Sequence, residues 1–67
     1  MLDDFDFVPV AGIIYQLTAL GAFLEVGTRR VFLPDSCLLS TTRGFQPGEV
    51  VTLQVLRSFA KRKGLIP

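Results

Sequence analysis

The chain has 67 residues, 49% of them hydrophobic, and a formal net charge of +1 at pH 7. This length fits one small domain, and no apolar run approaches the ~18 residues of a membrane-spanning helix. One cysteine and no histidine exclude an internal disulfide, a typical zinc site and a Ser-His-Asp triad. We therefore expect a cytoplasmic protein that is not an enzyme, needs no cofactor or metal and binds no membrane.

The acidic and basic residues are separated along the chain. Residues 1–28 contain four acids and no base, whereas residues 29–67 contain seven bases and two acids, which gives −4 and +5. A near-neutral total with one basic part is a weaker sign of nucleic-acid binding than a strongly basic domain. The overall charge therefore does not identify a partner.

The first nine residues, M-L-D-D-F-D-F-V-P, mix acids with aromatic rings. Aspartate is a poor strand former, and Pro9 cannot donate a hydrogen bond to a sheet. We expect residues 1–9 to form an acidic arm and residues 10–67 to form the domain. Two interpretations of the arm stay open. It is a flexible terminus, or it docks on the basic surface of the protein or on a partner.

Short runs of alternating apolar and polar residues, separated by glycine and proline turns, predict an all-β fold. The strands are expected at residues 10–17, 20–26, 29–33 and 49–58, with a short final strand at 65–67. Gly21 lacks a Cβ and allows a bend or bulge where the second strand begins. Residues 37–44 form a short connection, with Cys37 at least half-buried, and residues 60–64 form a basic loop. The pattern is typical of a small barrel.

Strand alternation also predicts the core. The residues expected to be buried together are Ile14, Leu17, Ala22, Leu24, Val26, Leu33, Val51, Leu53 and Val55. Phe32 is expected in the core because phenylalanine is usually buried, whereas Phe23 is expected on the opposite face of its strand.

Three stretches resemble the S1 RNA-binding domain family. The family pattern G-x-V-x-x-V-x-x-F-G-A-F-V is matched by Gly12, Ile14, Leu17, Leu20, Gly21, Ala22, Phe23 and Leu24. Residues 31–36, V-F-L-P-D-S, resemble the family's F-L-P-G-S segment, and residues 45–56, F-Q-P-G-E-V-V-T-L-Q-V-L, resemble its F-x-x-G-D-x-V-x-V-x-V-L strand. The resemblance implies a five-stranded OB-fold barrel with a trimmed connection between strands three and four. It also implies binding of RNA or another single-stranded nucleic acid, in translation or RNA metabolism.

Aromatic and basic side chains are the candidate binding residues, because such surfaces stack bases on rings and track phosphates with cations. The resemblance places Phe23 on the binding face and Leu20 where the family has its first aromatic. Tyr15 is expected to point outward unless a bulge reverses it. The candidate phosphate contacts are Arg29, Arg30, Arg43, Lys61, Arg62 and Lys63. Of the adjacent pair Arg29 and Arg30, one must face away.

A second function stays open. The same chain suits a small β-barrel used for protein interaction, as a subunit that docks on a larger cytosolic complex. Leucine in place of the family's aromatic, Pro34 in place of its frequent histidine and the near-neutral charge favour this alternative. The expected partner is therefore single-stranded RNA or a protein, and the expected state is a monomer or weak homo-oligomer. Met1 favours a true start, while the short last strand leaves room for another segment or subunit to complete the barrel.

Overall fold

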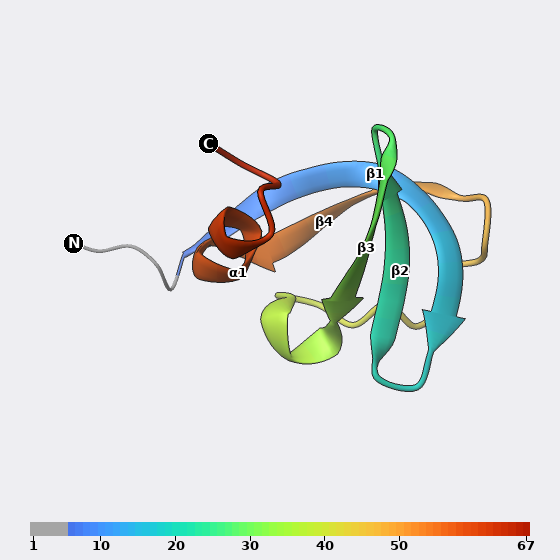
Figure 1. Ribbon diagram of the computed structural model, residues 1–67. Coiled ribbons are helices and arrows are strands. Elements are labelled where there is room, and N and C mark those ends of the chain that lie inside the picture. The colour runs from blue at the N-terminus through green and yellow to red at the C-terminus, as the bar shows by residue number, and fades with distance from the viewer. Residues whose placement is uncertain (1–5) are drawn as a thin grey trace.

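The computed structural model describes residues 6–67 as an open four-stranded antiparallel sheet with one short α-helix (Figure 1). The elements are β1 (Phe7–Thr18), β2 (Gly21–Val26), β3 (Arg29–Pro34), the 3₁₀ helix η1 (Asp35–Cys37), β4 (Val50–Leu56) and α1 (Arg57–Arg62). The strand order is β3-β2-β1-β4. The β-rich character predicted from the sequence is confirmed, whereas the predicted closed barrel of five strands is wrong.

The long strand β1 organises the sheet, because its two halves pair with different neighbours. Residues 7–13 pair with β4 and residues 13–18 pair with β2, so β1 arches over the molecule in Figure 1. The register shifts between Ile14 and Gln16, which makes Tyr15 the extra residue of a β-bulge. Such a bulge bends the strand and increases its twist. The irregularity therefore lies in β1, not at Gly21.

Gly21 has a different role from the one predicted. A Cβ at this position would overlap the carbonyl oxygen of Leu33 and lie 2.8 Å from the Cα of Pro34. The end of β3 therefore approaches the start of β2 too closely for any side chain. Glycine is needed here for close backbone approach.

The sheet begins earlier than the sequence predicts. Residues 7–9, which were expected to belong to the acidic arm, pair with β4 as part of β1. Val8 is buried in the core, and its burial ties this end of the strand down although Pro9 follows it. Of the other residues of the predicted arm, Asp6 is described, and residues 1–5 lie outside the described residues.

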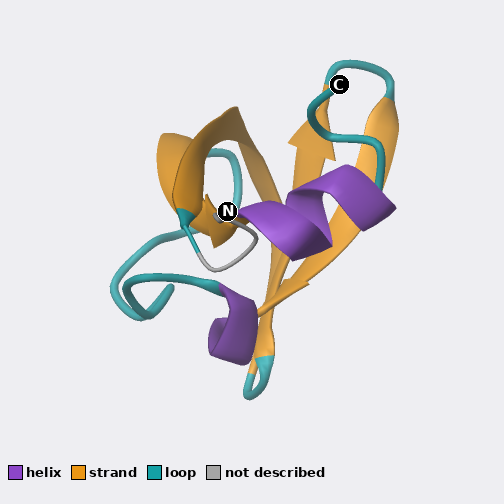
Figure 2. Ribbon diagram, turned by 90° about the vertical axis from the view of Figure 1, so that its left-hand side faces the viewer, coloured by secondary structure: helices purple, strands orange, loops and turns teal. Residues whose placement is uncertain are grey.

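The C-terminal part is helical where a basic loop was expected. α1 starts at Arg57, which ends β4 two residues before the predicted boundary, and no strand forms at residues 65–67. The helix buries Phe59 and Ala60 in the core, and this burial accounts for its position against the sheet. Figure 2, seen from the side of α1, shows the helix lying across the strands and η1 nearer the turn that joins β1 to β2.

The core follows the predicted alternation closely. Seven of the nine expected residues are buried, and the other two, Leu17 and Val26, are partly buried and pack against the core. Further buried residues are Val8, Val10, Val31, Leu38, Phe59 and Ala60. The connection after η1 runs beside the outer edge of β4, where Leu38 bridges Val55 and the Leu39 N–H donates to the Gln54 carbonyl at 2.9 Å.

Candidate functional site: the outer face of the sheet

Two cross-strand pairs on β2 and β3 define a surface that faces away from the core. Phe23 lies opposite Phe32, and Glu25 lies opposite Arg30. Alternate residues of a strand share a face, so these four side chains lie on one side of the sheet. The intervening residues of the two strands, such as Leu24, are buried on the other side. We call this surface, together with Tyr15 of β1, the outer face.

The two phenylalanines form an aromatic pair. Their ring centroids are 4.9 Å apart with an interplanar angle of 51°, and both residues are half-buried. Phe23 therefore lies off the core, as the alternation predicts. The prediction that Phe32 belongs to the core is wrong, because its neighbours Val31 and Leu33 take the inward positions in β3. The pair offers ring surface to solvent on a rigid, paired part of the sheet.

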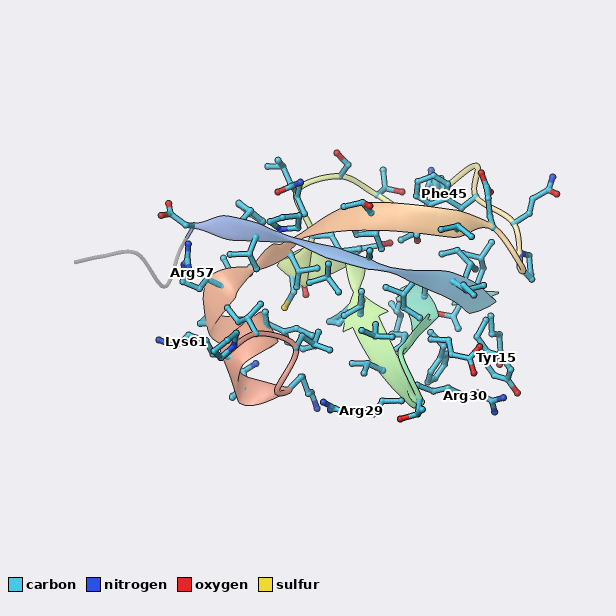
Figure 3. The ribbon with its side chains drawn as sticks, turned by 90° about the horizontal axis from the view of Figure 1, so that it is seen from above. Tyr15, Arg29, Arg30, Phe45, Arg57 and Lys61 are labelled. Carbon is cyan, nitrogen blue, oxygen red and sulfur yellow. The ribbon has the colours of Figure 1, made fainter. Side chains whose placement is uncertain are left out.

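Arg30 contacts Tyr15 and Glu25 on the outer face. Its guanidinium carbon lies 4.0 Å from the centroid of the Tyr15 ring, and its Nε lies 3.6 Å from Oε2 of Glu25. The bulge in β1 leaves Tyr15 exposed beside Arg30 (Figure 3). A cation over an aromatic face is attracted by the ring quadrupole, and the carboxylate adds a second attraction. The Arg30 side chain is therefore oriented by both neighbours.

The turn between β1 and β2 borders the other end of this surface. Leu20 is 74% exposed and, with Phe32 and Pro34, lines a hollow of about 350 Å³. The hydroxyl of Thr18 accepts hydrogen bonds from the N–H groups of Leu20 and Gly21, at 3.2 and 3.1 Å. The Leu20 carbonyl also accepts a 2.8 Å bond from the Asp35 N–H. These bonds hold the turn against η1, so the hollow is formed by fixed backbone.

Arg43 lies at a neighbouring hollow. This second hollow, of about 280 Å³, is also lined by Ala19 and Asp35, which border the first one. The loop that carries Arg43 is anchored by Thr42, a buried residue whose hydroxyl donates to Oδ1 of Asp35 at 3.3 Å. Arg43 therefore places a cation next to the turn.

The remaining predicted cations form a separate group around α1. The Arg29 guanidinium donates to the backbone carbonyls of Lys63 and Gly64. Arg62 and Lys63 lie over the Phe59 ring, 5.5 and 5.8 Å from its centroid. Figure 3 shows Arg29 and Lys61 away from Arg30 and Tyr15. The expected division of the arginine pair is found, because Arg29 is directed to the end of α1 and Arg30 to the outer face.

The structure thus brings together Tyr15, Phe23 and Arg30, with Leu20 and Arg43 at the turn, and leaves Arg29, Lys61, Arg62 and Lys63 elsewhere. The sequence reasoning missed two members of the outer face, Phe32 and Glu25. Alternation with Val31 and Leu33 was the signal for Phe32. Alternation places Glu25 on the same face of its strand as Phe23, but no local signal predicted that it lies beside Arg30, because that contact depends on the register of β2 with β3.

Comparison with models of known protein families gives no match, and no curated protein or solved structure is significantly similar to this chain. Within residues 6–67, no helix has the length and apolar character needed to cross a bilayer. The same part of the chain has no cluster of three or more His, Cys, Asp or Glu residues able to hold a metal ion. The resemblance to S1 domains stays a prediction.

Proposed function

We propose that this protein binds single-stranded RNA through the outer face of β1, β2 and β3. The observation that carries the proposal is the grouping of the half-exposed Phe23–Phe32 pair with the Tyr15–Arg30 stack. Aromatic faces bind bases of any sequence by stacking, and single-stranded nucleic acids are bound by such faces combined with cations. The resemblance to S1 domains supports RNA as the ligand class.

The surface offers successive contacts along β3. The hollow at Leu20 and Pro34 lies at one end, the phenylalanine pair follows, and the Tyr15–Arg30 stack lies at the other end. Residues two apart on a strand are separated by roughly 6.6 Å, so neighbouring contacts suit successive, partly extended nucleotides. Arg43 is placed to contact a phosphate beside the turn, since it lines the adjoining hollow.

The cations around α1 do not belong to this surface. Arg29 bonds the carbonyls that follow the helix, and Arg62 and Lys63 lie against Phe59. A short strand bound on the outer face therefore does not need them. A longer strand passing the end of α1 would meet their positive field, and that contact would be electrostatic and independent of sequence.

Fluorescence anisotropy with a labelled RNA hexanucleotide tests the proposal. Phe23→Ala should weaken binding by roughly 1–3 kcal/mol, the usual loss for one stacked base. The slope of log affinity against log salt should stay unchanged, because stacking releases no counterions. The matched control is Leu39→Ala, an exposed apolar residue on the connection after η1, which should bind as the parent does. A parent protein with no affinity for RNA at about 50 mM salt, where charges are little screened, would overturn the proposal.

A protein-interaction module is the second candidate, and one observation favours it. Ile13 and Val50 lie opposite each other on neighbouring strands and are 40% and 76% exposed. Ile13 also pairs with Glu25, so this apolar pair extends the outer face. A buried aromatic or apolar anchor is typical of protein interfaces. Failure of the RNA titration together with a folded parent protein would favour this candidate.

A further inference from the structure

We infer that the Glu25–Arg30 pair reads the edge of one base and selects cytosine. The inference rests on the proposed function, since it assigns a base preference to the same outer face. Glu25 and Arg30 lie opposite each other, two residues along β2 and β3 from Phe23 and Phe32. A base stacked on the phenylalanine pair therefore has its edge next to the charged pair.

The charge of the pair argues against a phosphate contact at this point. Oε2 of Glu25 lies 3.6 Å from Nε of Arg30, so the pair is neutral as a whole. A phosphate approaching Arg30 would also approach the carboxylate, and like charges repel. A neutral base edge carries no such penalty. The pair therefore suits hydrogen bonding to a base better than neutralisation of the backbone.

The free hydrogen-bonding groups of the pair determine which base fits. The ion pair uses Nε of Arg30 and Oε2 of Glu25, which leaves Oε1 of Glu25 and the two terminal NH₂ groups of Arg30 outside that contact. A carboxylate only accepts hydrogen bonds, and a guanidinium only donates them. In the proposed arrangement, Oε1 of Glu25 and the two NH₂ groups of Arg30 face the base in that order, which gives one acceptor followed by two donors. This is the order of groups on the pairing edge of guanine, whose complement is cytosine.

The other bases match this order less well. Cytosine presents the N4 amino donor and then the N3 and O2 acceptors, so all three of its groups find partners. Adenine presents one donor and one acceptor and leaves the third position empty. Uracil places its donor between two acceptors, and guanine places two donors together, so each meets a like group. A mismatched group is left without a partner, which disfavours the wrong base.

Two contacts fix the orientation of the Arg30 guanidinium before a base binds. The Tyr15 ring lies against the guanidinium at 4.0 Å, and Glu25 holds Nε from the neighbouring strand. The side chains of Arg30 and Glu25 are 55% and 38% exposed, so a ligand reaches them. Fixing the guanidinium before binding lowers the conformational entropy that is given up when a base is bound.

The test uses four labelled RNA heptamers. One consists of uridine alone (the uniform heptamer), and the other three carry cytidine, adenosine or guanosine at the central position. Binding is measured by fluorescence anisotropy. The parent protein should bind the cytidine heptamer about fivefold more tightly than the uniform one, the lower end for a good bidentate contact. Arg30→Gln should remove this preference and leave the salt slope on the uniform heptamer unchanged. Glu25→Ala should also remove the preference. It should tighten binding of the uniform heptamer and steepen the salt slope by up to about 0.7, because the freed guanidinium can then contact a phosphate.

The matched control is Arg29→Gln, the neighbouring arginine on the other side of β3, which should retain the preference for cytidine. Circular dichroism establishes that each variant is folded. Equal binding of all four heptamers by the parent, with Phe23→Ala still weakening binding, would overturn the cytosine inference and leave RNA binding intact. A preference for a purine, or a salt slope that falls in Arg30→Gln, would also overturn it. No binding to any heptamer would overturn the proposed function, and the inference with it.

Discussion

Replacing Gly21 with alanine tests the closest backbone contact in the sheet. The added Cβ would overlap the Leu33 carbonyl oxygen and lie 2.8 Å from the Cα of Pro34. Both obstructing groups belong to the backbone, so no side-chain rotation relieves the clash, and β3 has to move. Because Leu33 and Ala22 are fully buried, that movement also disturbs the core.

We expect Gly21→Ala to cost about 3 kcal/mol, the upper end of the usual range for overpacking. In a domain of this size each 1 kcal/mol lowers the thermal midpoint by roughly 4–8 °C, so the midpoint should fall by about 12–24 °C. Thermal unfolding followed by far-ultraviolet circular dichroism measures the change. The control is Gly27→Ala in the turn between β2 and β3. Gly27 has φ +62° and no atom within 4 Å of an added Cβ, so only backbone strain of about 1 kcal/mol should appear.

A midpoint for Gly21→Ala as high as that of Gly27→Ala would contradict the close approach of β3 to β2. The same result would weaken the description of the outer face, because the pairing of Phe23 with Phe32 depends on this register.

Two further predictions concern the core and the basic group at α1. Leu33→Ala, at a fully buried position, should lower the free energy of unfolding by about 2–5 kcal/mol in urea titrations, and an unchanged urea midpoint would contradict the inward direction of Leu33. Replacing Lys61, Arg62 and Lys63 all by glutamine should leave the slope of log affinity against log salt unchanged for a hexanucleotide. With an RNA of about 20 nucleotides, the same triple variant should flatten the slope by up to about 0.7 for each phosphate that is no longer neutralised. A flatter slope with the hexanucleotide would show that these cations contact even a short RNA, and would contradict their separation from the outer face.

Local alternation predicts most of the sheet. In β4, residues 51, 53 and 55 point inward and residues 52 and 54 outward, as the period of two indicates. Glycine and proline turns likewise mark the ends of β2 and β3. These features depend only on residues that are neighbours along the chain, so they can be predicted from the sequence.

The errors arise where tertiary contacts override local preference. Pro9 argues against a strand, yet the burial of Val8 and pairing with β4 keep residues 7–9 in β1. The basic run after Ala60 has the composition of a loop, yet Phe59 and Ala60 anchor a helix on the core. The pattern of short strands and turns predicted a small barrel, and the resemblance to S1 domains predicted five strands, but no fifth strand forms within residues 6–67.

Only part of the candidate site was predicted, because the rest of it depends on contacts between strands. Phe23, Tyr15 and Arg30 were identified as residue types suited to nucleic acids, but their grouping depends on register and on the bulge in β1. Alternation separates Arg29 from Arg30, whereas the register brings Glu25 to Arg30. The basic residues of the sequence therefore belong to two unrelated surfaces, which composition alone does not distinguish.

Chemical-shift mapping with an RNA hexanucleotide tests the central claim most directly. Amide and side-chain signals are followed during the titration in about 50 mM salt, where charges are little screened. We expect the largest shifts at Tyr15, Phe23, Arg30 and Phe32, smaller shifts at Leu20, and almost none at Lys61. Shifts confined to α1, or no shifts at all, would contradict RNA binding by the outer face of the sheet.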